Sequence, residues 1–237
     1  MFLEKFCTIN NDKISFSRQQ ASDFAKKIAD DFNPLHDIDA KRFCVPGDLL
    51  FSLALERSGL SQEMTFIFSG MVTDNIALNF PKEITGQAAI TDEDNKEYVK
   101  ISVNGDTTTN SESVRSLTQA YVEFSGHTFP HILVALMAEN NVMINPARPM
   151  VMYESMSIHL DELNFSDIKL ELASSKLSIE GKRGTADLIF DLIANGKTIG
   201  HGKKHMLLSG LRAYEQSTIE QVVENYNQTK AAFLAAS

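Results

Sequence analysis

Residues 49–55 read LLFSLAL, and this almost wholly apolar segment constrains the fold more than any other part of the chain. Asp48 just before it and Gly59 shortly after it are residue types that begin and end helices. A helix that is apolar on every side must be buried on every side, so other elements have to surround it. After Gly59, apolar residues recur at every second position, as in Phe66 and Phe68, which is typical of β-strands. The sequence therefore predicts a buried helix wrapped by a curved antiparallel sheet.

The same order of elements is predicted twice along the chain. A second apolar segment at 129–137 contains Pro130 near its start, as Pro46 precedes the first, about 84 residues earlier. Asn195-Gly196 tolerates the positive φ angles of a type I′ turn and predicts a hairpin. The polar stretch 105–113 predicts a long turn or linker between the two halves. Strands are predicted at 64–80, 84–92, 97–104, 150–161, 168–179, 184–195 and 198–209, with a closing helix at 214–234.

Composition and charge restrict the class of protein. The chain has 237 residues and a formal net charge of −9, which argues against a nucleic-acid surface because such a surface needs concentrated basic residues. Two cysteines in a chain of this length favour a reducing compartment, and Cys44 is expected to be a small buried hydrophobe rather than a nucleophile. No signal peptide is recognisable, and no apolar run is long enough to cross a bilayer. We therefore expect a cytoplasmic protein that binds neither nucleic acid nor membranes.

The segment Asp31-Phe32-Asn33-Pro34-Leu35-His36 carries the strongest chemical signal. It follows a helix that is predicted to begin with a capping box at Ser17 and to end near Asp31. Pro34 stiffens the bend, so Asp31 and His36 would be held at a fixed separation, as an acid/base pair requires. An alternative is purely structural: Asp31 and Asn33 cap the end of a helix, and His36 is a turn residue.

This segment and the Val45-Pro46-Gly47 entry to the buried helix resemble the signature of the MaoC-like hydratases, a family that includes the R-specific enoyl-CoA hydratases of the hotdog fold. The resemblance implies an α+β double hotdog, with one unit at 1–112 that carries the motif and a second unit at 113–237 that lacks it. It also implies a lyase that hydrates or dehydrates an acyl thioester of coenzyme A or acyl carrier protein. Asp31 and His36 would be catalytic, and Asn33 and Gly47 would bind substrate. No metal or other cofactor is implied.

Three departures from the family pattern keep other functions open. Asp30 stands where the family has glycine, Asp48 lies beside the expected carbonyl-binding N–H, and the segment from His36 to Gly47 is short. A protein that binds an acyl thioester or a partner without turnover, and a thioesterase, are therefore retained as alternatives. The oligomeric state also stays open. A homodimer is one alternative, although two units in one chain could already form the pairing that single-unit relatives achieve as dimers.

Other histidines are weaker candidates for a functional site. His127 and His131 lie four residues apart, but no third metal ligand with suitable spacing is evident, so no metal site is predicted. In the strand at 198–209, alternation places His201, Lys203 and His205 on one solvated face. These three residues are the expected contacts for an acidic group such as a coenzyme A phosphate.

Overall fold

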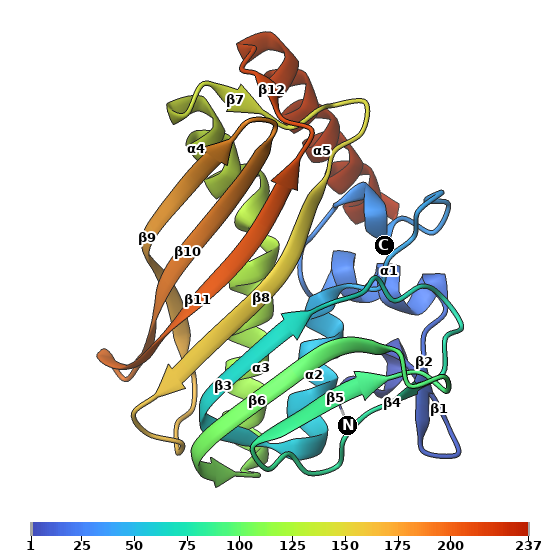
Figure 1. Ribbon diagram of the computed structural model, residues 1–237, viewed down its shortest axis with the longest axis vertical. Coiled ribbons are helices and arrows are strands. Elements are labelled where there is room, and N and C mark those ends of the chain that lie inside the picture. Colours follow the sequence, from blue (N-terminus) through green and yellow to red (C-terminus); the bar gives the residue numbers. More distant parts are fainter. Residues whose placement is uncertain (1, 237) are drawn as a thin grey trace.

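The computed structural model describes residues 2–236, and its main feature is a ten-stranded sheet in which all neighbouring strands are antiparallel (Figure 1). The strand order is β1-β2-β4-β5-β6-β3-β8-β11-β10-β9, and β12 pairs with β7 in a separate small sheet. The strands are β1 (Thr8–Asn10), β2 (Lys13–Ser15), β3 (Leu60–Phe68), β4 (Leu78–Asn79), β5 (Gln87–Thr91), β6 (Glu97–Thr108), β7 (Val142–Met143), β8 (Val151–Leu160), β9 (Lys169–Glu180), β10 (Arg183–Ala194), β11 (Lys197–Ser209) and β12 (Arg212–Ala213).

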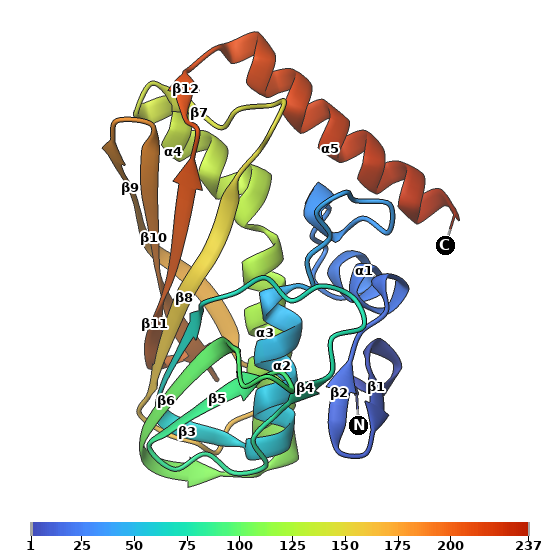
Figure 2. The ribbon, with the colours of Figure 1, turned by 45° about the vertical axis from the view of Figure 1, so that its right-hand side comes forward.

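Two helices pack side by side against one face of this sheet, as Figures 1 and 2 both show for α2 and α3. Eight consecutive residues of α2, from Asp48 to Leu55, are buried, as its apolar sequence predicts. A third helical segment, α4, continues beyond α3 after a kink in which Phe129 is extended. The helices are α1 (Arg18–Lys27), α2 (Gly47–Ser58), α3 (Ser111–Gly126), α4 (Leu133–Glu139) and α5 (Gln216–Ala236), with short turns η1 (Glu4–Phe6), η2 (Pro34–His36) and η3 (Thr128–Ile132).

Much of the predicted element order is confirmed. The four long strands of the second half, β8 to β11, lie within about two residues of their predicted bounds. Asn195 and Gly196 both have positive φ, at 52° and 75°, and join β10 to β11 as a hairpin. Ser17 caps α1 with the reciprocal hydrogen bonds of a capping box. The buried helix at 48–59 is α2.

The interpretation of residues 105–113 as a linker is wrong. β6 extends to Thr108, and α3 begins at Ser111, with the Asn110 side chain accepting hydrogen bonds from the N–H groups of Glu112 and Ser113. The polar residues are therefore the outer end of a strand and the first turn of a helix. The helix that lies beside α2 is α3, so the proposed equivalence of the helices after Pro46 and Pro130 is also wrong.

The structure thus defines an α+β protein built around one large antiparallel sheet. Its main core lies between this sheet and the helices α2 and α3. Within residues 2–236, no helix combines the length and the hydropathy needed to cross a membrane.

Candidate functional site

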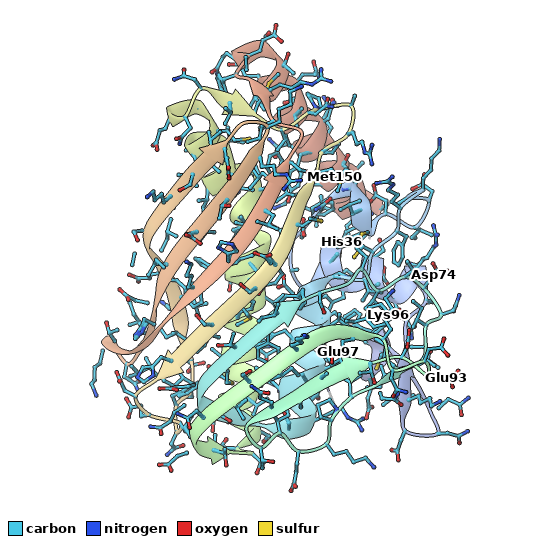
Figure 3. All side chains as sticks on the ribbon, in the orientation of Figure 1. His36, Asp74, Glu93, Lys96, Glu97 and Met150 are labelled. Atoms are coloured by element: carbon cyan, nitrogen blue, oxygen red, sulfur yellow. The ribbon has the colours of Figure 1, made fainter. Side chains whose placement is uncertain are left out.

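A large cavity of about 990 Å³ lies where the bend at residues 30–36 meets the start of α2, the first residues of β8 and one face of α5. Figure 3 marks His36 and Met150, two of the residues that line it, in the region between β8 and α5. All four residues predicted to form the site line this cavity: Asp31, Asn33, His36 and Gly47. The structure therefore brings together side chains from the bend and the first turn of the buried helix.

The bend is positioned by a close approach of two backbones. The carbonyl oxygen of Ala29 lies against Gly126, the last residue of α3, so closely that a Cβ at Gly126 would be 1.5 Å from that oxygen. Asp30 then takes a left-handed conformation with φ 54°. Glycine adopts such a conformation without steric cost, which gives a physical reason for glycine at this position in the MaoC-like signature. The chain reverses at Asp30 and directs Asp31 into the cavity.

Short-range hydrogen bonds then fix the motif. The Asp31 carboxylate accepts the Asn33 N–H at 2.9 Å through Oδ1, and Asn33 Oδ1 accepts the Leu35 N–H at 3.1 Å. Asn33 thus caps the start of the η2 turn, whereas the structural alternative expected it to cap the end of the preceding helix. Its amide nitrogen has no hydrogen-bond partner among the described residues and remains able to contact a ligand. Asn33 can therefore both hold the bend and contact a substrate.

His36 and Asp31 face each other across a short gap. His36 is buried, and its Nδ1 lies 2.7 Å from the carbonyl oxygen of Cys44. Because a carbonyl only accepts, Nδ1 carries the proton and Nε2 of the neutral ring is an acceptor. Nε2 lies 3.7 Å from Asp31 Oδ2, too far for a direct hydrogen bond but suited to two groups that contact one water. The pair is therefore arranged to hold and activate water.

Asp30, the other carboxylate of the bend, is paired away from this gap. It forms an ion pair with Lys230 of α5, and its Oδ2 lies 3.5 Å from His127 Nε2. Tyr226 of α5 adds a second link, because its hydroxyl accepts the Phe32 N–H and donates to the Asp30 carbonyl, both at 3.2 Å. Burial raises the pKa of Tyr226 to about 12, so it stays a neutral donor. Asp30 therefore attaches α5 to the bend.

Gly47 occupies the first position of α2, where a backbone N–H has no intrahelical acceptor. The aromatic rings of Phe68 and Tyr153 pack on it, since a Cβ at Gly47 would lie 3.2 Å and 3.1 Å from them. The two rings also contact each other, with centroids 4.4 Å apart. Because Gly47 has no side chain, the two rings can pack directly against its backbone.

A buried polar cluster of Asp48, Ser125 and Lys204 lies in the wall of the same cavity. Lys204 Nζ donates to Ser125 Oγ at 2.6 Å, and Ser125 Oγ in turn donates to Asp48 Oδ2 at 2.6 Å. Burial raises the pKa of Asp48 and lowers that of Lys204, while the opposite charge of each partner works against those shifts. Asp48 Oδ1 has no hydrogen-bond partner among the described residues. The Asp48 carboxylate is thus held by Ser125 through one oxygen only.

Sequence reasoning missed this cluster. Lys204 could have been found from the alternation of β11, which places it on the same inward face as Gly202 and Met206. A lysine on the apolar face of a strand needs a buried partner. Nothing in the sequence around Ser125 distinguishes it from other helical serines.

The candidate residues of β11 lie outside the cavity. His201, Lys203 and His205 do share the outer face of β11, as predicted, and Lys203 pairs with Asp187 at 2.9 Å. None of the three lines the cavity, so their predicted contact with a coenzyme A phosphate is not supported by this site. Within residues 2–236, no group of three or more His, Cys, Asp or Glu side chains is arranged to hold a metal ion. Burial raises the pKa of Cys44 to about 11, which disfavours a nucleophilic thiolate.

The fold and cavity define an α+β protein with a ligand-sized cavity beside a buried helix. Its sequence belongs to the family described as "Protein of unknown function (DUF3581)", which matches residues 1–217. No curated protein matches the chain significantly.

Three solved structures show weak similarity. An acyl-CoA thioesterase II, TesB2, from Mycobacterium marinum is 9% identical with a TM-score of 0.46, covering 91% of this chain and 99% of that one. A putative thioesterase II from Thermobifida fusca is 8% identical with a TM-score of 0.42, covering 86% and 95%. A putative oleoyl thioesterase from Lactobacillus plantarum is 7% identical with a TM-score of 0.37, covering 82% and 90%. Similarities at this level do not establish a shared reaction.

Proposed function

We propose that the protein is an enzyme that adds water to, or removes it from, an acyl thioester bound in the cavity, with Asp31 and His36 as the acid/base pair. The observation that carries the proposal is that both side chains, 3.7 Å apart, line a cavity of about 990 Å³ that Gly47 also lines. A cavity of this size accommodates an elongated organic ligand. The substrate class, a 2-enoyl thioester, comes from the motif resemblance.

In hydration, a water held between His36 Nε2 and the Asp31 carboxylate would attack C3 of the enoyl group. His36 Nε2 takes a proton from the water as the water oxygen bonds to C3, and this proton is then delivered to C2, while the Asp31 carboxylate accepts the other hydrogen of the water. Negative charge develops on the thioester oxygen as this proceeds. The Gly47 N–H, at the positive end of the α2 dipole, is the proposed donor to that oxygen, and Asn33 would orient the substrate.

Hydrolysis of the thioester is a second candidate, favoured by the Asp48, Ser125 and Lys204 cluster. These groups line the same cavity, and the hydration mechanism does not use them. Such buried ionisable groups are common at reaction centres. Hydration conserves the C–S bond, whereas hydrolysis breaks it, so product analysis separates the two reactions.

We further infer that the fold is a double hotdog with units at 1–112 and 113–237. All strands of the first half lie on one side of the central β3–β8 pair, and β11, β10 and β9 lie beyond β8 on the other. A helix that packs on the sheet precedes the long strands of each half, α2 before β3 and α3 before β8. This arrangement supports two similar units that share one continuous sheet.

The proposal is tested with crotonyl-CoA and purified protein. Hydration removes the absorbance of the conjugated thioester without releasing thiol, and hydrolysis releases free coenzyme A that a thiol reagent detects. We expect hydration, reduced by about 10²–10⁴-fold in His36→Asn and Asp31→Asn, because each loses one acid/base group. His131→Asn is the matched control, since His131 is exposed and does not line the cavity.

Thiol release in place of hydration would select the second candidate. Absence of any turnover over a range of acyl chain lengths, or full activity in His36→Asn, would contradict the proposed enzyme. Binding without turnover would then be the remaining function of the cavity.

A further inference from the structure

Helix α5 crosses one side of the cavity and is only lightly packed. Figure 2 shows it extending away from the sheet, from the end of β12 toward the segment that contains the bend. Over its whole described length, Gln216–Ala236, Ile219 is its only buried residue. Its far end is attached to the bend by Tyr226 and Lys230, which contact Asp30, and by a ring contact between Phe233 and Phe32. The helix is thus a wall of the cavity rather than part of the core.

The face that α5 turns to the cavity is polar but uncharged. The residues on this face recur every three or four positions, as neighbours on one side of a helix do. They are Ser217, Thr218, Gln221, Val222, Asn225, Tyr226 and Thr229. Other parts of the cavity are apolar, with Leu133, Ile144, Val151 and Met206 among their side chains. A ligand that reaches from α5 to these apolar side chains therefore needs one neutral polar part and one apolar part.

Gln221 and Asn225 present complementary hydrogen-bonding groups. Gln221 Nε2 donates to Asn225 Oδ1 at 2.9 Å, which fixes the two side chains relative to each other. Gln221 Oε1 and Asn225 Nδ2 have no further hydrogen-bond partner among the described residues. One acceptor and one donor are thus left on neighbouring turns of the helix. This pattern matches a secondary amide, which offers one N–H and one C=O.

We propose that α5 binds the amide-bearing arm of a phosphopantetheine-type thioester, with Gln221 and Asn225 contacting its amides, and that the acyl chain lies against the apolar wall. The inference rests on the proposed function for the choice of a thioester and deepens it, because it assigns recognition of the carrier to specific residues. The family match ends at Ser217, so this recognition surface lies almost wholly outside the matched region.

The test compares two thioesters of crotonic acid, one with coenzyme A and one with ethanethiol, which has no amides. In the double variant Gln221→Leu/Asn225→Leu, we expect kcat/KM for the coenzyme A ester to fall at least about tenfold, mainly through KM, because two hydrogen bonds are lost. The ethanethiol ester should be unaffected. Gln228→Leu is the matched control, since Gln228 forms a similar pair with Glu224, at 2.7 Å, and does not line the cavity.

An equal fall with both esters, or no fall with either, would overturn the assignment of α5 to the carrier arm. If the wild-type protein turns over neither ester, calorimetric binding of coenzyme A separates this inference from the proposed function. Binding to the wild type that is weakened at least tenfold in the double variant supports the inference even then. Equal binding by both proteins, or no binding to the wild type, overturns it.

Discussion

Replacing Lys204 with methionine should destabilise the protein strongly, because it leaves a carboxylate buried without its cation. Asp48 and Lys204 are 7% and 4% exposed, and Ser125 connects them through two hydrogen bonds of 2.6 Å. Removing one member of a buried charged pair costs about 3–5 kcal/mol. In a chain of this length each kcal/mol lowers Tm by about 2–4 °C, so a fall of roughly 6–20 °C is expected.

The stability lost in Lys204→Met should depend on pH, and the direction of the shift in the pKa of Asp48 determines whether it grows or shrinks as pH rises. Burial already raises this pKa, and the Lys204 charge, which lowers it, is absent in Lys204→Met. A carboxyl with a higher pKa in the folded than in the unfolded state destabilises the fold above its folded pKa. That loss disappears as pH falls toward the unfolded value of about 3.9. The stability difference between wild type and variant should therefore be largest at high pH and should shrink as pH falls toward about 3.9.

Urea or thermal unfolding of four proteins tests this reasoning. The double variant Asp48→Asn/Lys204→Met removes both charges and should recover most of the lost stability. Lys203→Met is the control, because Lys203 lies on the outer face of the sheet and its exposed pair with Asp187 is worth about 0–1 kcal/mol. A loss under about 1 kcal/mol in Lys204→Met, or a double variant as unstable as the single one, would refute the account.

Three further predictions concern the bend, α5 and one charged residue of the cavity wall. Gly126→Ala should lower the free energy of unfolding by about 1–3 kcal/mol or more, because the new Cβ would be 1.5 Å from the Ala29 carbonyl oxygen. An unchanged urea unfolding curve would contradict this contact. Tyr226→Phe, which loses two hydrogen bonds of 3.2 Å, should speed amide exchange at Phe32, and equal exchange rates would show that α5 is not held there. Arg42 lines the cavity, is exposed and has no ion-pair partner among the described residues. Arg42→Ala should therefore raise KM for crotonyl-CoA but not for crotonyl-pantetheine, which lacks phosphate, and equal effects on the two would exclude a phosphate contact.

The elements that could be predicted from the sequence are those whose signal is local. The alternating residues of β10 and the Asn195-Gly196 turn specify their own structure, because side-chain period and turn geometry act within a few residues. The capping box at Ser17 is equally local. α3 also has local signals, the Asn110 cap and the buried Val114, Leu117 and Tyr121 at helical spacing, but its polar first turn has the composition of a loop.

The candidate site was only partly predictable for the same reason. The motif Asp31–His36 is a contiguous segment, so its residues could be identified from the sequence alone. The partners that complete the cavity come from distant segments: Ser125 from the end of α3, Lys204 from β11 and Tyr226 from α5. These residues come together only through the order of the strands in the sheet and through the contact of Gly126 with the Ala29 carbonyl. Neither can be predicted from a local sequence pattern.

The attachment of α5 to Asp30 has a consequence for how the site forms during synthesis. The residues that hold the 30–36 bend include Tyr226, Lys230 and Phe233, which are translated almost 200 residues after it. Because the chain is synthesised from its N-terminus, the bend leaves the ribosome well before the α5 residues that hold it. The side chains of Asp31 and His36 would therefore become fully ordered only among the last events of folding.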